Sequence, residues 1–453
     1  MKMRKIWTLL MVITIIGLGY GWVYCSRPSK KVSNKKESFS KPVELVESVL
    51  LSEAKPEELG IQSNILDEID QIALNGVKQK AYPGCQVLVA IDGKIIYRKG
   101  FGTTTYESSE AIRNDHIYDI ASVSKIAAST LAIMRLQTED KFSLDKKLGD
   151  YLPEVVGNTE FANILLRNMM SHRAGLVAWI PFYKKTLENN EFNKLYYRTA
   201  KEKGFENQVA KDVWLRSDYT DTIYKRIISS GLTPGNHYLY SDLGYYFIKK
   251  IVEKQAGKSL NEFVMDEIYK PLNLKNIGYL PQSFAELDRI VPTENDQAFR
   301  KQLVHGFVHD PGAAMLGGVG GHAGLFANST DLAAIMQLFL NKGKAGDKQF
   351  LNPAVVEEYT RVQFPGNRRG AGFDKPTLSR KDGPCCDEAS SESFGHSGFT
   401  GTFAWADPVY NINYVFLSNR VCPSAENKKL VNMGIRTEIQ RVIYKAIKAR
   451  KNQ

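Results

Sequence analysis

Residues 85–99 read CQVLVAIDGKIIYRK, and the fold prediction starts from this stretch. Two runs rich in β-branched and other apolar residues flank the dipeptide Asp92-Gly93, which is the strongest short-range signal for a two-residue hairpin turn. Two further strand-like runs lie near the other end of the chain, at 402–406 and 412–418. Strand signals therefore lie at both ends of the chain, with a long segment between them.

Helical patterns dominate that middle segment. They include a stretch from Ser122 to about Gln137, and the stretches 243–254 and 331–340. A last helix places its apolar residues on one face at 3.6-residue spacing, namely Ile435, Ile439, Val442, Ile443, Ala446 and Ile447. We therefore expect an α/β protein of the α+β type. An antiparallel sheet flanked by helices would come from about 46–160 and 335–450, and a mainly helical part would be inserted at about 160–335.

The first 45 residues differ from this body. Ile6 to Ser26 is a run of 21 residues without a charge, preceded by a short basic head. As a helix this run would span about 30 Å of bilayer hydrocarbon, so residues 1–26 are predicted to be a membrane anchor or signal segment. Residues 27–45 are rich in Ser and Lys and are expected to form a basic, flexible linker to the domain at 46–450.

A retained anchor is the favoured interpretation of this segment, and two alternatives stay open. One is a cleaved signal peptide, although Gly19 and Gly21 make only a weak peptidase site. The other is lipidation at Cys25, although Tyr24 stands where that processing needs a small residue. The basic linker conflicts with a simple positive-inside orientation if the domain is exported.

Charge argues against a nucleic-acid partner. The 453 residues include 43% hydrophobic and 24% charged residues, which is typical of a folded protein with a sizeable core. The net charge is +11, but the first 41 residues hold nine basic residues and one acidic residue, so +8 of it lies there. The remaining +3 on the body leaves no electrostatic footprint for nucleic acid.

Neither the cysteines nor the histidines predict a metal or another cofactor. The five cysteines (Cys25, Cys85, Cys385, Cys386 and Cys422) include no C-x-x-C pair, and their number is odd. A bridge between Cys422 and the 385/386 pair stays open. His305, His309 and Asp310 lie close together, but Gly306 interrupts the segment and Pro311 ends it, so they fall short of a coordination set.

The sequence Ser122-Val-Ser-Lys125 is the first candidate for catalysis. Its S-x-x-K spacing alone decides nothing, because four other pairs share it: Ser33/Lys36, Ser38/Lys41, Ser52/Lys55 and Ser143/Lys146. Lys125 is distinctive because it is the only charged residue between Asp119 and Arg135, in a run that is apolar on nearly all sides. Such a helix is buried, and burying an ammonium costs several kcal/mol unless it is paired or deprotonated.

Two interpretations of Lys125 follow. If Ser122 opens the helix, Lys125 lies one turn later on the same side, where a desolvated amine of lowered pKa would take the hydroxyl proton. The helix N-terminus would then supply an N–H group for a developing oxyanion. The alternative is a structural lysine that is neutralised by a buried carboxylate.

Three motifs in order resemble those of the penicillin-recognising serine hydrolases, which include class C β-lactamases, low-molecular-mass penicillin-binding proteins and related esterases. They are Ser122-Val-Ser-Lys125, Tyr240-Ser-Asp242 and His396-Ser397-Gly398. Flanking segments are also similar, at 83–89, 171–176, 324–332, 395–401 and 405–408. The resemblance covers about residues 46–445 and implies a β-lactamase/transpeptidase-like fold. His322-Ala-Gly324 imitates the third motif, but it precedes a predicted helix, and we expect it only near the cleft.

The resemblance implies a role for each motif. Ser122 would attack the substrate carbonyl and form an acyl-enzyme, while Lys125 and Tyr240 would share the proton transfers. His396, Ser397 and Gly398 would line the site from an edge strand, and the backbone N–H of Phe399 would complete an oxyanion hole with that of Ser122. The glycines around this third motif, Gly395, Gly398 and Gly401, would let the substrate approach the strand closely.

The chain departs from the family pattern at two positions. Asp242 stands where an Asn is usual, which replaces an amide donor by a carboxylate that only accepts hydrogen bonds. His396 stands where many members have the lysine that meets the carboxylate of β-lactams. Both departures favour an esterase or peptidase over an efficient β-lactamase. The polar loop 367–393, with Arg368, Arg369 and Lys375, is a candidate wall of the cleft.

The sequence thus predicts a membrane-anchored serine hydrolase in the bacterial cell envelope, with its catalytic domain outside the cytoplasm. By analogy with family members, D-alanyl peptides of the cell wall are the expected substrates, cleaved in a carboxypeptidase or endopeptidase reaction. A carboxylesterase, a D-amino-acid amidase and a β-lactamase are the alternatives. A non-enzymatic alternative is a slowly acylating sensor that binds penicillin or peptide. No cofactor, metal or nucleic acid is expected.

Overall fold

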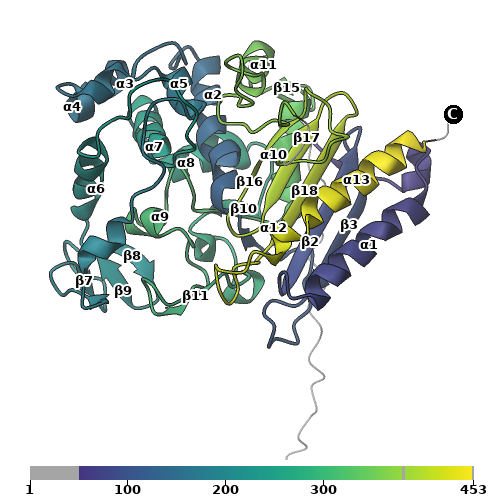
Figure 1. Ribbon diagram of the computed structural model, residues 1–453, viewed down its shortest axis with the longest axis horizontal. Coiled ribbons are helices and arrows are strands. Elements are labelled where there is room, and N and C mark those ends of the chain that lie inside the picture. Colours follow the sequence, from purple (N-terminus) through teal and green to yellow (C-terminus); the bar gives the residue numbers. More distant parts are fainter. Residues whose placement is uncertain (1–49, 380–382, 451–453) are drawn as a thin grey trace, which may run out of the picture. The chain divides into compact units, whose positions relative to one another are not determined.

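The main sheet grows from the predicted hairpin (Figure 1). The computed structural model describes residues 50–379 and 383–450. Strands β2 (Gly84–Ile91) and β3 (Lys94–Gly102) pair antiparallel around Asp92 and Gly93. Both turn residues have positive φ, 53° and 75°, as a type I′ turn requires. The hairpin prediction is confirmed.

The two ends of the domain meet in the middle of this sheet. The strand order is β1-β3-β2-β18-β17-β16, in which only β1 (Ser52–Glu53) pairs parallel to its neighbour. Strand β18 (Ile412–Ser418) pairs with β2, and β17 (Phe403–Asp407) pairs with β18. Strand β16 (Phe394–Ser397) forms the edge. The predicted antiparallel sheet is therefore present, built from residues 52–102 and 394–418.

Helices cover both faces of the sheet (Figure 1). Helices α1 (Ser63–Lys78) and α13 (Ile435–Lys448) contact each other on one face, and α10 (Ser329–Leu340) packs on the other. Successive side chains of a strand point to opposite faces. Val87 and Val89 accordingly belong to the core under α1 and α13, and Leu88 belongs to the larger core on the α10 side.

The segment between β3 and β16 forms the rest of the domain and carries most of the remaining helices. The longest are α6 (Tyr219–Ile228) and α7 (Leu243–Ala256). The shorter ones are α2 (Leu131–Thr138), α3 (Leu148–Tyr151), α4 (Pro153–Val156), α5 (Leu166–Met170), α8 (Leu260–Val264), α9 (Pro311–Met315) and α11 (Pro353–Thr360), while α12 (Lys429–Asn432) follows the sheet.

Short strands interrupt this helical segment, and the sequence patterns did not predict them. One small sheet has the order β7 (Tyr197–Arg198), β9 (Val213–Leu215), β8 (Asn207–Ala210). Another has the order β10 (Ile277–Tyr279), β13 (Leu325–Ala327), β4 (Tyr118–Asp119). The rest form two-residue pairs: β5 (Leu187–Glu188) with β6 (Glu191–Phe192), β11 (Asn295–Asp296) with β12 (Gln302–Leu303), and β14 (Lys344–Ala345) with β15 (Lys348–Gln349).

Two predictions from the sequence concern the chain ends and the cysteines. The anchor at 1–26 and the linker at 27–45 lie outside the described residues. Between residues 50 and 450, in the described part, no helix is long and apolar enough to cross a bilayer. Cys422 is a buried thiol, so the bridge to the 385/386 pair is not formed.

Candidate active site

Ser122 follows strand β4, at the start of a helical segment whose helix type changes along its length. Sequence periodicity predicted one helix from Ser122 to about Gln137. The structure has a 3₁₀ turn at Ala121–Val123, a π-helical turn at Lys125–Thr130 and then α2. Ala121 has φ 47°, and its N–H donates to Asp119 Oδ1 over 2.8 Å. A strained turn and a π-helical turn thus flank the partly exposed Ser122, and such irregularities are frequent at functional sites.

The Lys125 side chain is fully buried and meets three acceptors. Its Nζ lies 2.9 Å from Ser122 Oγ, 3.0 Å from the carbonyl oxygen of His322 and 2.7 Å from Asp242 Oδ1. The Lys125 ammonium thus donates two hydrogen bonds, to Ser122 Oγ and the His322 carbonyl, and forms an ion pair with Asp242. It also brings the first and second motifs of the sequence into contact.

The structure corrects the predicted protonation state of Lys125. Burial acts to lower the pKa of Lys125, but the Asp242 carboxylate and Tyr240 outweigh it and raise that pKa above its ordinary value. The prediction of a desolvated amine with a lowered pKa is therefore wrong. Lys125 carries its proton at neutral pH and donates a hydrogen bond to Ser122 Oγ, and the carboxylate expected in the alternative interpretation is Asp242.

Tyr240 lies beside this ion pair, between two cations. Lys125 Nζ is 5.3 Å from the centre of its ring, and the guanidinium carbon of Arg369 is 5.7 Å from it. The imidazole of His172 packs against the ring at 4.4 Å between centroids. Two cationic side chains and one imidazole therefore surround the Tyr240 ring.

His396 lines the site from β16, and the prediction of an edge strand is confirmed. Its Nε2 lies 3.4 Å from Arg369 Nη2, which can only donate, so Nε2 is the acceptor and Nδ1 carries the proton. That Nδ1–H donates to the Ser397 carbonyl over 2.7 Å. Burial, and then the positive charges of Arg369 and Lys125, hold the pKa of His396 well below its usual value. His396 is therefore neutral.

The loop after β16 is hydrogen-bonded to residues 119–120, the segment that precedes Ser122. Thr400 Oγ1 donates to the Asp119 carbonyl over 2.8 Å, and Thr402 Oγ1 donates to the Ile120 carbonyl over 2.9 Å. A Cβ on Gly398 would lie 2.1 Å from Thr402 Oγ1 and 2.5 Å from the Ile120 oxygen. A glycine is therefore required at 398 because the loop packs closely against this segment. The sequence pattern had suggested a different reason, namely close approach of the substrate.

Phe399 follows Gly398, and its side chain is largely exposed. Its ring stacks on His309 with centroids 5.6 Å apart, and Arg420 lies over its ring at 4.7 Å. The structure thus places Phe399 in the loop that contacts the nucleophile segment. The role of its backbone N–H in an oxyanion hole stays a prediction.

Three further histidines go to separate partners. His322 Nε2 lies 2.7 Å from Asp310 Oδ1, and its carbonyl accepts from Lys125, which confirms that this segment lies near the cleft. His309 Nε2 lies 2.7 Å from Glu294 Oε2, while His305 Nε2 contacts the carbonyls of Leu287 and Ile290. The part of the chain that is described brings no three His, Cys, Asp or Glu side chains together as a metal site.

Sequence reasoning missed how His172 and Arg369 contribute. His172 lies within the flanking similarity at 171–176, but nothing in the pattern showed that it packs on Tyr240. Arg369 was expected in a polar cleft wall, yet it is 1% exposed, with Nη1 3.1 Å from Asp374 Oδ1. Arg368 also pairs with Asp374. The sequence alone does not indicate which of the two adjacent arginines, Arg368 or Arg369, has a buried side chain.

The chain is similar to known proteins over most of its length. A family model described as Beta-lactamase matches residues 69–432. A protein of Escherichia coli strain K12 named as a D-alanyl-D-alanine carboxypeptidase is 29% identical over 415 residues, which cover 85% of this chain and 89% of the relative. An N-acetylmuramyl-L-alanine amidase of Bacillus subtilis strain 168 is 27% identical over 381 residues, which cover 78% of this chain and 81% of the amidase.

Solved structures show the same fold. A penicillin-binding protein homologue from Caulobacter crescentus superposes with a TM-score of 0.61 and 17% identity, covering 84% of this chain and 98% of the homologue. A class C β-lactamase gives a TM-score of 0.60 at 17% identity, covering 83% of this chain and 97% of the enzyme. The predicted β-lactamase/transpeptidase-like fold is confirmed.

Proposed function

Because the chain belongs to the beta-lactamase family and is a serine hydrolase, we propose that it cleaves D-alanyl peptides of the bacterial cell wall through an acyl-enzyme on Ser122. The contact between Lys125 Nζ and Ser122 Oγ carries this proposal. Ser122, Lys125 and Tyr240 lie close together after strand β4, which supports Ser122 as the nucleophile. The name of the Escherichia coli relative supports the choice of substrate.

The geometry supports a specific division of labour. Protonated Lys125 donates to Ser122 Oγ, so the Ser122 hydroxyl proton is directed elsewhere. We assign the phenolate form of Tyr240, whose ring lies 5.3 Å from Lys125 Nζ, as the base that takes this proton and becomes the neutral phenol. The Ser122 oxygen bonds to the substrate carbonyl carbon as the peptide C–N bond breaks, and the proton passes to the departing D-alanine amine. Water then hydrolyses the ester and restores the serine.

The departures from the family pattern shape the choice of substrate. Asp242 is committed to Lys125, so it does not offer the amide donor that Asn would. Neutral His396 lacks the charge with which lysine attracts a carboxylate, but buried Arg369 lies directly behind it. This arrangement argues for slow processing of β-lactams.

The proposed location is the outside of the cytoplasmic membrane, with residues 1–26 as a retained anchor. The support is the uncharged run Ile6 to Ser26 and its basic head. An enzyme tethered there would meet the cell-wall polymer directly.

A second candidate reaction is hydrolysis of the amide between a muramyl sugar and L-alanine. The similarity to the Bacillus subtilis amidase favours it, because its identity and coverage are close to those of the carboxypeptidase relative. Both reactions use the same acyl-enzyme chemistry and differ only in the bond that is presented to Ser122.

Product analysis separates these possibilities. Full-length protein and the Ser122→Ala variant are incubated with muramyl pentapeptide, and free D-alanine and released pentapeptide are measured by mass spectrometry. We expect many molecules of D-alanine per enzyme and none with the variant. Release of pentapeptide would assign the amidase reaction instead. A single stoichiometric burst without turnover would contradict the proposal and favour the sensor.

A further inference from the structure

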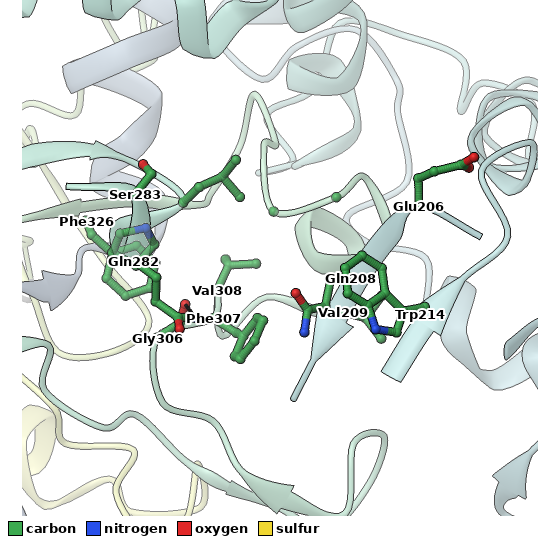
Figure 2. A pocket seen from close by; sticks show the side chains of 14 residues that line it. Glu206, Gln208, Val209, Trp214, Gln282, Ser283, Gly306, Phe307, Val308 and Phe326 are labelled. Atoms are coloured by element: carbon green, nitrogen blue, oxygen red, sulfur yellow. Dashed lines mark hydrogen bonds between the residues drawn. The ribbon is translucent and has the colours of Figure 1, made fainter. Parts of the chain in front are cut away.

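A cavity of about 300 Å³ lies apart from the catalytic side chains (Figure 2). Figure 2 shows Gln282, Ser283 and Phe326 on one side of it and Gln208 and Trp214 on the other. Neither Ser122, Lys125, Tyr240 nor His396 lines this cavity. Its volume lies at the lower end of the range of small-molecule sites, about 300–1,000 Å³.

The cavity nevertheless shares its wall with the nucleophile segment. Phe326, on β13, pairs with Asp119 on β4, three residues before Ser122. Val308 also lines the cavity, and the next residue, His309, donates its backbone N–H to Asp119 Oδ2 over 2.6 Å. A ligand in the cavity would therefore contact Phe326 and Val308, which belong to the two segments that hold Asp119 at the start of the catalytic helix.

The wall around Leu280 has two features that are typical of a ligand-binding site. Leu280 has φ 53° and a side chain that is 42% exposed, a combination that is strained for the backbone and unfavourable for an apolar group. Gly318 lies beneath it, and a Cβ there would come within 2.7 Å of Leu280 Cδ2. A strained, exposed leucine that closes over a glycine is expected where a ligand covers it.

The opposite wall presents an aromatic ring beside an amide. Gln208 and Trp214 are directly opposed across strands β8 and β9, so their side chains share one face. Trp214 is only half-buried, which leaves part of the indole available for contact. On the facing wall Gln282 uses its Nε2 to bind the Gly306 carbonyl over 3.0 Å, which fixes the direction of its free carbonyl oxygen.

The charge of the lining restricts the ligand. No Lys, Arg or His lines the cavity within the described ranges, and its one carboxylate is Glu206 at the rim. A hydrogen bond from Ser217 lowers the pKa of Glu206, so this group is negatively charged at neutral pH and repels anions. A plain hydrocarbon chain is also disfavoured, because it would offer no partner to the Gln208 amide or to the Gln282 carbonyl oxygen.

We propose that this cavity is a subsite for a neutral pyranose sugar of the N-acetylhexosamine type. The apolar face of the ring would lie on Trp214, and its hydroxyl and acetamido groups would hydrogen-bond to Gln208 and Gln282. The proposal rests on the proposed function, because a stem peptide of the cell wall is attached to such a sugar. The sugar would anchor the substrate while Ser122 acts on the peptide.

Direct titration tests the subsite without any chemistry. Full-length protein is titrated with di-N-acetylchitobiose by isothermal calorimetry, alongside Trp214→Ala, Trp214→Phe and Gln208→Leu. We expect saturable binding that weakens at least about tenfold, or about 1.4 kcal/mol, in Trp214→Ala, and less in Trp214→Phe. Leu195→Ala removes an exposed side chain of the same inserted part outside the cavity, and it should bind like the wild type. Thermal melting of each variant verifies folding.

The catalytic prediction for the same variants is a loss of sugar preference. The ratio of kcat/KM for muramyl pentapeptide to that for sugar-free pentapeptide should exceed about 10 and fall towards 1 in Trp214→Ala. Absence of saturable chitobiose binding, or equal affinity in Trp214→Ala and wild type, would overturn the subsite. The Ser122→Ala variant should still bind chitobiose. Binding that depends on Trp214 without any D-alanine release would therefore reject the proposed function and keep the subsite.

Discussion

Lys125 keeps its charge inside an otherwise apolar helix because three acceptors surround it. Asp242 is the decisive one. An asparagine at 242 would offer a neutral oxygen, whereas the carboxylate keeps the proton on the lysine. In the proposed mechanism Tyr240 is therefore the proton acceptor. The departure from the usual family motif is thus a change in the electrostatics of the nucleophile.

Replacing Asp242 by Asn tests this assignment. The substitution removes the main influence that raises the pKa of Lys125 and leaves burial, which lowers it. The alkaline limb of the rate of Ser122 labelling by a fluorophosphonate should therefore move down by about one pH unit or more. Asp145→Asn, in an exposed pair with Arg167, is the matched control and should leave the profile unchanged. An unshifted alkaline limb in Asp242→Asn would refute the assignment.

Single residues were predictable where a motif named them. Ser122, Lys125, Tyr240 and His396 converge as the resemblance implied, since each stands in a short motif with a fixed local structure. The protonation state of Lys125 was not predictable, because it depends on Asp242, 117 positions further along the chain. An ion pair between residues far apart in the chain gives no recognisable pattern in a single sequence.

At the level of elements, strand β16 and the start of the catalytic helix behave as one unit. The hydroxyls of Thr400 and Thr402 join the loop after β16 to the carbonyls of Asp119 and Ile120. These contacts fix the distance between the third motif and the nucleophile. The loop therefore acts as a spacer for the site and not only as a connection to β17.

The double variant Thr400→Val, Thr402→Val should separate positioning from stability. Each lost hydrogen bond is expected to lower the free energy of unfolding by about 1 kcal/mol, because a buried carbonyl loses one of its donors. The Ile120 carbonyl keeps the backbone N–H of Val123 at 3.1 Å. Misplacement of the loop should slow fluorophosphonate labelling at least about tenfold. Thr360→Val breaks a similar bond to Val356 in α11 and is the control for stability alone. Equal labelling rates in both variants would show that the loop does not position the site.

Elements with a strong local signal were predicted well. The Asp92-Gly93 hairpin, the helix α13 and strand β18 follow from turn chemistry and periodicity. The strands β4, β8, β9 and β13 were missed because two to four residues are too few to show alternation. Those short strands hold the nucleophile and one wall of the cavity, so the less predictable elements lie at the site.

For the molecule as a whole, buried neutral histidines should make stability depend on pH. Burial, and then nearby positive charges, hold the pKa of His172 and of His396 well below their usual values. Below about pH 6.5 the unfolded chain binds these protons and the folded chain does not, so stability falls as pH falls. Asp331 acts in the opposite direction, because burial raises its pKa to about 6.

Urea unfolding between pH 7.5 and 5.5 measures this effect. Between pH 7.5 and pH 5.5, protonation of the two histidines in the unfolded chain should lower the free energy of unfolding by about 2–3 kcal/mol. Protonation of Asp331 in the folded chain should raise it by about 1 kcal/mol over the same range. His396→Gln should flatten the profile, and Asp331→Asn should steepen it. A stability that is constant or rises towards pH 5.5 would contradict the neutral state of the two imidazoles.

The proposed function depends on acylation of Ser122, to which protonated Lys125 donates a hydrogen bond. The most direct test is peptide mapping by mass spectrometry after separate incubation of full-length protein with a fluorophosphonate and with a penicillin. We expect a fluorophosphonate adduct on Ser122, none in Ser122→Ala, and slower or partial acylation of the same residue by penicillin. An adduct on another serine, or no adduct with either reagent on folded protein, would contradict it.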